Sequence, residues 1–174
     1  MAPRVVLVGP MGSGKSTVAA ILAERWGVAV RDTDDDIVAT EGREISEIFV
    51  DDGEEHFRAL ERAAVATALA EHDGVLALGG GAVLDPGTRD LLAGHPVVFL
   101  NVGLSDAVKR VGLGVGRPLL LGNVRSRVKA LLDERLPIYQ AVATVQVDTD
   151  GRTPEEVAGE VADTVEKREA ESGE

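Results

Sequence analysis

The fold is decided near the amino terminus, where residues 4–16 have the sequence RVVLVGPMGSGKS. An apolar strand at 4–8 leads without a gap into the pattern G-x-x-x-x-G-K-S at 9–16, and a helical pattern follows at 16–25. Glycines let a loop curl so that its N–H groups point at phosphate oxygens, and the amino end of a helix favours an anion. The alternative is a strand-to-helix turn without a ligand. Because the strand, the glycines, the lysine and the serine are all in register, we expect a cradle for nucleotide phosphates.

Short apolar runs alternate with helical patterns along the rest of the chain. Together with 4–8, strands are expected at 28–31, 75–78, 97–101 and 144–148, and helices at 16–25, 34–40, 45–50, 54–71, 88–93, 105–111, 124–136 and 155–169. The helix at 124–136 is expected to end before Pro137, because proline disfavours helical backbone in the residue that precedes it. This alternation indicates an α/β fold in which helices cover both faces of a parallel sheet. The length of 174 residues indicates one domain, 1–174.

The composition excludes several classes of protein. The chain has no cysteine, which excludes disulfides and thiolate metal sites, and its net charge of -12 argues against general binding to nucleic acid or anionic membranes. No apolar run approaches the roughly 20 residues that span a bilayer, and the first residues lack the layout of a signal peptide. We therefore expect a cytoplasmic protein with no nucleic-acid or membrane partner. A monomer is expected, since the sequence has no zipper pattern.

Acidic residues after the second strand are candidates for metal binding and catalysis. Lys15 is expected to reach the β- and γ-phosphates and Ser16 to place a hydroxyl on Mg²⁺, which usually needs a carboxylate nearby. The third strand ends in glycines, whereas two strands end in aspartate, at Asp32 and Asp148, and only Asp32 starts an acidic cluster. Asp34 lies two residues further on, so one carboxylate could face the metal and the other an acceptor hydroxyl. A base in that position contributes typically ~10²–10⁴-fold in rate.

Three arginines could form a basic pocket in this acidic chain. Arg58 has glutamates four residues before it and three residues after it, and this spacing alone favours surface pairs over a fixed grip on a carboxylate. Arg117 lies in the glycine-rich stretch 112–122, where an arginine is either solvated or closes over the γ-phosphate as part of a lid. Arg135, two residues before Pro137, either caps helix carbonyls or points into the cleft.

Taken together, these features resemble the shikimate kinase family, from Val5 to about Val157. After the phosphate loop, the markers are D-T-D at 32–34, D-G-E, F-R and E between 52 and 61, G-G-G-A at 79–82, R-P-L-L at 117–120 and E-R, P and Y between 134 and 139. The resemblance implies a three-layer α/β/α P-loop kinase fold with a five-stranded parallel sheet in the order 2-3-1-4-5, a substrate-binding region at about 33–61 and a lid at about 112–124. It also implies ATP as co-substrate, Mg²⁺ as cofactor and shikimate as acceptor.

The resemblance further implies a role for each site residue. ATP would be bound by Met11, Gly12, Ser13, Gly14, Lys15, Ser16, Thr17, Arg110, Arg117, Arg152 and Pro154. Ser16 and Asp32 would hold Mg²⁺, Asp32 through water, and Asp34, Lys15 and Arg117 would be catalytic, with Asp34 as the base. Shikimate would be bound by Asp34, Arg58, Gly79, Gly80, Gly81 and Arg135, with Glu61 orienting Arg58 and with an apolar wall of Ile45, Phe49 and Phe57.

Two other interpretations are compatible with the phosphate loop. A gluconate kinase or a nucleoside monophosphate kinase would share it, but a monophosphate kinase should have a longer basic lid and residues that recognise a base. A nucleotide-binding switch without chemistry would not need Asp34 in addition to Lys15. We therefore expect ATP-dependent phosphorylation of the 3-hydroxyl of shikimate, in chorismate and aromatic amino-acid biosynthesis. Residues 111–116 carry no polar side chain, which predicts a lid that is loose without a ligand.

Overall fold

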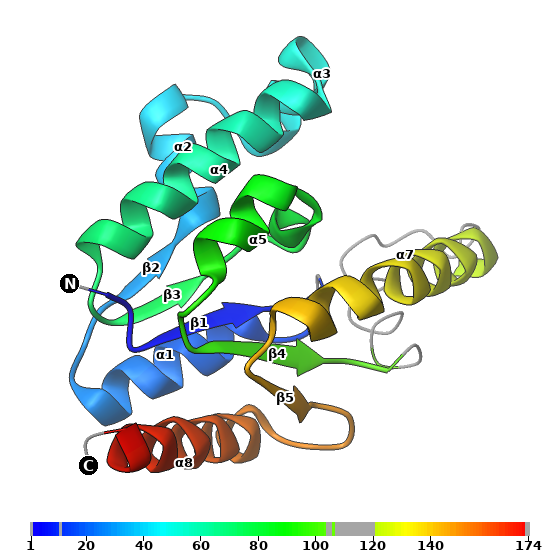
Figure 1. Ribbon diagram of the computed structural model, residues 1–174. Helices are drawn as coiled ribbons and strands as arrows, with labels where there is room; N and C mark the ends of the chain where they lie inside the picture. Colours follow the sequence, from blue (N-terminus) through cyan, green and yellow to red (C-terminus); the bar gives the residue numbers. More distant parts are fainter. Residues whose placement is uncertain (1, 11, 104–105, 107–120, 173–174) are drawn as a thin grey trace.

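The computed structural model describes residues 2–10, 12–103, 106 and 121–172, and Figure 1 shows the arrangement of its elements. The strands are β1 (Val5–Val8), β2 (Val30–Asp32), β3 (Val75–Ala77), β4 (Val97–Asn101) and β5 (Val145–Asp148). The helices are α1 (Lys15–Trp26), α2 (Thr33–Glu41), α3 (Ile45–Asp52), α4 (Glu54–Glu71), α5 (Pro86–Leu92), α7 (Leu121–Val142) and α8 (Pro154–Ser172), and a 3-10 turn spans Ala82–Leu84. The expected helix at 105–111, apart from residue 106, and the expected lid up to residue 120 lie outside the described residues.

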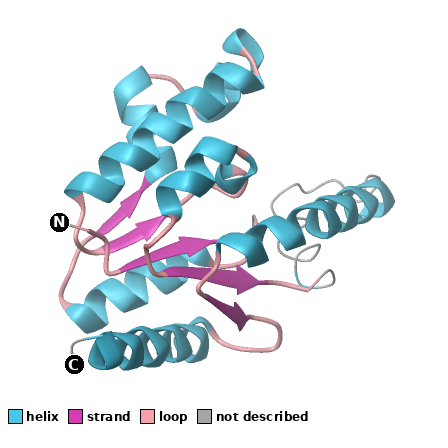
Figure 2. Cartoon of the chain, viewed as in Figure 1, coloured by secondary structure: helices cyan, strands magenta, loops and turns pink. Residues whose placement is uncertain are grey.

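The strands form a five-stranded sheet in the order β2-β3-β1-β4-β5, and every neighbouring pair is parallel (Figure 2). This confirms the expected strand order and direction. The first strand, β1, lies in the centre, where Val6 is opposite both Leu76 of β3 and Val97 of β4. Because all the strands run the same way, their carboxyl ends meet at one edge of the sheet, which is where open α/β sheets bind ligands.

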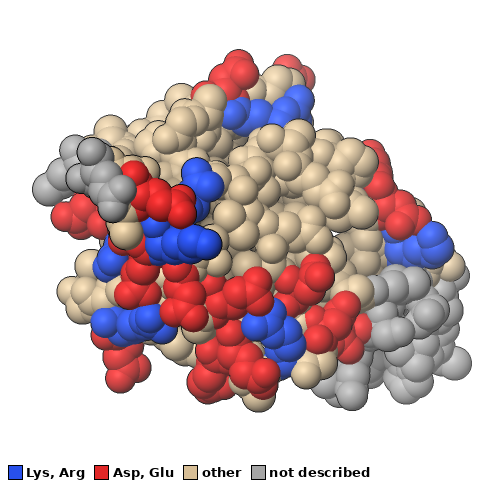
Figure 3. All heavy atoms as spheres, turned by 60° about the horizontal axis from the view of Figure 1, so that its bottom comes forward, with Lys and Arg blue, Asp and Glu red and all other residues tan. Residues whose placement is uncertain are grey.

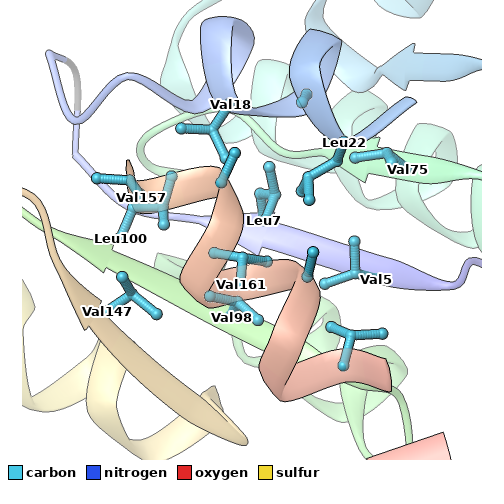
Figure 4. Packing of buried hydrophobic residues seen from close by; sticks show 14 of the residues in the cluster. Val5, Leu7, Val18, Leu22, Val75, Val98, Leu100, Val147, Val157 and Val161 are labelled. Atoms are coloured by element: carbon cyan, nitrogen blue, oxygen red, sulfur yellow. The ribbon is translucent and has the colours of Figure 1, made fainter. Parts of the chain in front are cut away.

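Helices cover both faces of the sheet, as the alternating side chains of β1 demonstrate. Val5 and Leu7 pack with Leu22 of α1 and Val161 of α8 in one buried cluster (Figure 4). The intervening residues of β1 point to the opposite face and pack against side chains of α4, α5 and α7 in a second cluster. A smaller third cluster joins α2, α3 and α4. It supports the part of the chain that the sequence assigns to substrate binding.

Helix α7 continues through Pro137 to Val142, so the expectation that this helix ends before the proline is wrong. Proline lacks an N–H and therefore removes the hydrogen bond to the carbonyl four residues earlier. That residue, Asp133, is exposed, so water can bind to its carbonyl instead. After the proline, Tyr139 is buried in the second cluster and Ile138 packs against it. This packing holds the last turns of α7 in place despite the missing hydrogen bond.

Ion pairs connect α8 to the segment before β1 and to α1. Arg4 donates to both carboxylate oxygens of Glu169, at 2.9 and 2.8 Å, and its guanidinium carbon lies 4.1 Å from the centre of the Trp26 ring. Arg25 of α1 pairs with Glu166 of α8 at 2.7 Å. Figure 3 shows this face, with basic side chains among more extensive acidic ones. Within the described part of the chain, no helix has the length and apolar character needed to cross a membrane.

Candidate active site

The phosphate loop connects β1 to α1 at the carboxyl edge of the sheet. Gly9 and Gly14 have φ angles of 151° and 90°, which other residues rarely adopt. A Cβ on Gly9 would also lie 2.7 Å from the carbonyl oxygen of Leu100, so the loop fits closely against the end of β4. Ser16 and Thr17 are exposed in the first turn of α1. Their hydroxyl groups can therefore be reached by a ligand at the amino end of this helix.

Lys15 folds back over the phosphate loop. Its Nζ donates to the carbonyl oxygens of Gly9, at 2.5 Å, and Pro10, at 3.1 Å. Burial lowers the pKa of Lys15 to about 8, although the nearby charges of Asp34 and Asp32 act in the opposite direction. The lysine therefore joins the phosphate loop electrostatically to the two carboxylates that follow β2.

Asp32 and Asp34 lie where β2 passes into α2. Asp32 caps the helix, because its Oδ1 accepts the backbone N–H of Asp34 at 2.8 Å. Burial raises the pKa of both carboxyl groups, and for Asp34 the charge of Asp32 raises it further while Lys15 lowers it. The other aspartate that ends a strand, Asp148, lies on the edge strand β5 and accepts from Asn101 at 3.1 Å. The charge of Asp32 raises the pKa of Lys15, so Asp32, rather than Asp148, is the strand-end aspartate that interacts with the phosphate loop.

The glycine turn after β3 lies against Asp34 and Arg58. A Cβ on Gly79 would lie 2.7 Å from Asp34 Oδ1, and one on Gly81 would lie 2.5 Å from Arg58 Nη2. Arg58 Nη1 donates to Glu61 Oε1 at 2.7 Å, and the two side chains are only 16% and 2% exposed. The prediction of a surface pair, which the spacing alone favoured, is therefore wrong. Arg58 is held in the site by a carboxylate whose pKa is raised by burial, against the effect of Arg58 itself.

An apolar wall lies beside Arg58. The rings of Phe49 and Phe57 are 4.6 Å apart between centroids. The guanidinium carbon of Arg58 lies 5.9 Å from the first ring centre and 5.4 Å from the second. Ile45 packs against the third buried cluster, which includes Phe57 and Ile48. The structure thus brings together the three apolar residues that the sequence assigns to this wall.

Helix α7 approaches the glycine turn from another side. Arg135 Nη1 lies 3.5 Å from the carbonyl oxygen of Gly80, and the hydroxyl of Tyr139 donates to the same oxygen. No role in the site was predicted for Tyr139. The signal was its position four residues after Arg135, which places both side chains on one helix face. That signal could be used only if the helix was known to continue through Pro137.

A pocket lies next to the phosphate loop, beside the segment that connects β5 to α8. Its volume is about 240 Å³, and it is lined by Ser13, Gly14, Thr17, Val18, Thr149, Arg152, Pro154 and Val157. Arg152 Nη1 donates to the carbonyl of Asp148 at 3.0 Å and to Glu160 Oε1 at 2.7 Å. The structure therefore places Arg152 and Pro154 in a pocket beside the phosphate loop, and their contact with a nucleotide base stays a prediction. Thr149, Val18 and Val157 line the pocket without having been predicted.

Some predicted site residues are not placed. Met11, Arg110 and Arg117 lie outside the described residues, so their roles stay predictions, as does a loose lid.

The oxygen donors at Ser16 and Asp32 fit a magnesium ion. Mg²⁺ prefers hard oxygen ligands and usually takes one or two from the protein, completing its shell with water and phosphate oxygens. The described residues contain no cluster of three or more histidine, cysteine or acidic side chains that could hold a metal ion. A magnesium ion held by only two protein oxygens, with nucleotide phosphates among its other ligands, is compatible with this finding.

Comparison with known proteins identifies the family. A protein-family model described as shikimate kinase matches residues 11–166. The chain belongs to the shikimate kinase family. A shikimate kinase of Streptomyces avermitilis is 62% identical over 97% of this chain and 98% of its own length, and one of Salinispora arenicola is 65% identical over 93% and 97%. The structure of a shikimate kinase from Acinetobacter baumannii in complex with shikimate matches with a TM-score of 0.87 and 31% identity, over 97% of this chain and 94% of that one.

Proposed function

We propose that the protein transfers the γ-phosphoryl group of ATP to the 3-hydroxyl of shikimate, giving ADP and shikimate 3-phosphate. The observation that carries this proposal is the placement of Asp34, Arg58 and Arg135 around one glycine turn, with Asp34 close enough to Lys15 to affect its pKa. An acceptor with a hydroxyl at one end and a carboxylate at the other fits this set of side chains. Membership in the shikimate kinase family supports the same acceptor.

The nucleotide would lie along the phosphate loop. Backbone N–H groups of the loop and the amino end of α1 would bind its phosphates, and Lys15 would leave the loop carbonyls for the β- and γ-phosphates. The pocket of about 240 Å³ beside Arg152 and Pro154 would bind the adenine base of ATP. Arg152 is held by Asp148 and Glu160, so the face of its guanidinium has a fixed position against which a planar base can stack.

The acceptor would lie over the glycine turn. Arg58 Nη1 is held by Glu61, and the buried Nε lies 3.8 Å from Glu54 Oε1. The remaining nitrogen, Nη2, lies beside Gly81. The guanidinium groups of Arg58 and Arg135 would bind the acceptor carboxylate through charge-assisted hydrogen bonds. The absence of side chains at Gly79 and Gly81 lets Asp34 and Arg58 lie directly against this backbone. A ring bound by these two side chains would therefore also lie close to the glycine turn.

Asp34 is the proposed base. Its carboxylate would accept the proton of the 3-hydroxyl as that oxygen bonds to the γ-phosphorus and the bond to the ADP oxygen breaks. Burial and Asp32 raise the pKa of Asp34, which moves it towards the neutral range in which a base is most effective. Lys15 would neutralise charge on the transferred group. Ser16 and Asp32 would hold Mg²⁺, which supplies further neutralisation of phosphate charge when it is bound.

We also propose that residues 1–174 form one domain that works as a cytoplasmic monomer in aromatic amino-acid biosynthesis. The continuous sheet, to which strands from β1 to β5 all contribute, supports the single domain. Size-exclusion chromatography with light scattering tests the oligomeric state, and a dimer mass would contradict it.

A coupled assay for ADP release tests the proposed reaction. The protein is supplied with MgATP and, in separate reactions, shikimate, gluconate, each common nucleoside monophosphate or no acceptor. ADP release with shikimate alone is expected, and faster release with another acceptor would overturn the proposal. Asp34→Asn should bind ADP normally but lose about 10²–10⁴-fold in turnover. Asp35→Asn removes an equal charge from an exposed neighbour and should retain turnover.

A further inference from the structure

The carbonyl of Gly80 receives two donors from one face of α7. Tyr139 donates its hydroxyl to this oxygen, and Arg135 Nη1 lies 3.5 Å from it, at the limit of a hydrogen bond. We propose that Tyr139 is a positioning residue for the acceptor: it satisfies the Gly80 carbonyl, fixes the glycine turn, and thereby leaves Arg135 free to bind the acceptor carboxylate. The proposal deepens the proposed function and rests on it, because it assigns that carboxylate to Arg135.

The ring of Tyr139 is rigidly held. The residue is 2% exposed, and its ring stacks on that of Phe99 of β4, the neighbour of the central strand, with 4.8 Å between ring centroids and 19° between ring planes. A ring held in this way can move its hydroxyl oxygen very little. The hydrogen bond to Gly80 therefore ties the glycine turn to the rigid centre of the sheet as well as to α7.

Fixing the Gly80 carbonyl also fixes its neighbour. The peptide group between Gly80 and Gly81 is planar and trans, so the N–H of Gly81 points opposite to the carbonyl of Gly80. The N–H of Ala82 donates to the carbonyl of Gly79 at 3.1 Å and closes the turn, but glycines on both sides of the central peptide would allow it to adopt either orientation. The hydroxyl of Tyr139 selects one orientation of a turn that has no side chains with which to select it.

The same hydrogen bond decides what Arg135 can do. A carbonyl that is left without a donor in a partly buried site has a strong tendency to find one. Without the tyrosine hydroxyl, Arg135 is the donor already 3.5 Å away, and we expect its guanidinium to close on Gly80. Its N–H groups form a rigid fork, so a guanidinium turned towards Gly80 presents a poorer fork to a carboxylate.

The hydroxyl stays protonated and able to donate. Burial raises the pKa of Tyr139, and this effect outweighs the lowering by Arg135 and Arg58. The geometry depends on α7 continuing through Pro137, because only an unbroken helix places Arg135 and Tyr139 one turn apart on the same face.

The first test compares Tyr139→Phe with Thr144→Val. Phenylalanine keeps the stacked ring and removes only the hydroxyl. We expect the dissociation constant and the KM for shikimate to rise about 3- to 10-fold, with the KM for ATP unchanged and kcat within about 2-fold. Thr144→Val also removes a hydroxyl, which donates to the His95 carbonyl and accepts the Val97 N–H, but at the opposite end of the sheet. It should leave the KM for shikimate unchanged.

A double-mutant cycle with Arg135→Ala separates positioning from simple packing. If Tyr139 acts by keeping Arg135 free, removing the hydroxyl should have less effect on shikimate affinity in the Arg135→Ala background than in the wild type. Equal effects in both backgrounds, or wild-type shikimate affinity in a folded Tyr139→Phe protein, would overturn the inference. Loss of the proposed function is a distinct result, since then the wild type would not turn over shikimate or Arg135→Ala would bind it normally.

A further measurement uses the protein without amino-acid substitutions, so its result does not depend on whether a variant folds. Tyr139 is the single tyrosine of the chain, so 3-fluorotyrosine incorporated throughout labels this position alone. Its ¹⁹F resonance should shift when shikimate is added at saturation and should stay in place with ADP alone. A resonance that does not respond to shikimate refutes a role for this hydroxyl in positioning the acceptor.

Discussion

Replacing Gly79 with alanine would add a methyl group beside the carboxylate proposed as the base. The added Cβ would lie 2.7 Å from Asp34 Oδ1 and 3.1 Å from Glu61 Oε2, whereas ordinary contacts begin at 3.4 Å. The backbone of Gly79 is not among those with positive φ, so alanine is compatible with its conformation. The substitution therefore acts on the two carboxylates and not on the path of the chain.

The size of the effect follows from the overlap. Asp34 Oδ1 must move by about 0.7 Å to reach an ordinary contact distance, and a misplacement of about 1 Å in a reacting group costs roughly 10²-fold in rate. We expect kcat with shikimate to fall about 10- to 100-fold. The KM for ATP should change little, because the phosphate loop is on another segment of the chain. Thermal unfolding should show a stable fold, since the ends of two side chains can yield to the methyl group.

The assay is steady-state ADP release at saturating MgATP with varied shikimate, accompanied by thermal unfolding of each protein. Gly159→Ala is the matched control: it lies in α8, and apart from the neighbouring residues of its own helix no atom is within 4 Å of its added Cβ. It should keep wild-type kcat and gain about 0.5–1 kcal/mol in stability, as expected for glycine to alanine inside a helix. A folded Gly79→Ala protein with near wild-type kcat would refute the idea that the position of Asp34 controls the rate.

Two further predictions concern charge. Because burial lowers the pKa of Lys15 to about 8, the affinity for MgADP, measured by calorimetry, should fall as the pH rises above that value, and a constant affinity up to about pH 9.5 would contradict this. The unfolded state, with a lysine pKa of 10.5, binds more protons than the folded state between about 8 and 10.5, so Lys15 should make the free energy of unfolding rise with pH in that window, and Lys15→Met should lose this rise. Glu61→Gln keeps an oxygen for Arg58 but removes its charge, so the KM for shikimate should rise about 5- to 30-fold with the KM for ATP unchanged. Since burial raises the pKa of Glu61, urea unfolding should show no large loss of stability in this variant, and an unchanged KM for shikimate would exclude a role of Glu61 in orienting Arg58.

Much of the fold could be predicted because it depends on local pattern. The phosphate loop is specified by consecutive residues, and Gly27 ends α1 with a left-handed φ of 66°, close to the end expected at residue 25. The strand order needed the resemblance to a family, since the order of strands in a sheet depends on contacts between residues far apart in the chain. The predicted end of α7 was wrong. Proline disfavours helical backbone in the residue before it, but the burial of the helical turns that follow Pro137 outweighs this effect.

The site shows the same division. Asp32 and Asp34 could be assigned from their place at a strand end, but spacing alone favoured the wrong environment for Arg58. Its pairing with Glu61 is the same in sequence on a surface or in a cleft, and only the packing of α4 against the glycine turn makes it buried. Tyr139 was missed for a related reason. Its partner is the backbone carbonyl of Gly80. Because every residue has such a carbonyl, the type of residue at position 80 does not indicate the contact.

The central position of β1 has a consequence for how the chain is made. The first strand to be synthesised is also the one that needs neighbours on both sides, and these come only with β3 at Val75–Ala77 and β4 at Val97–Asn101. Until β4 has emerged from the ribosome, β1 is an apolar segment that lacks at least one of its partners, and Gly9 has no β4 carbonyl to pack against. Such long-range pairing is slow to form and exposes apolar surface in the meantime. We expect nascent chains that stop before β4 to depend on chaperones, and the nucleotide site to be among the last parts of the molecule to be completed.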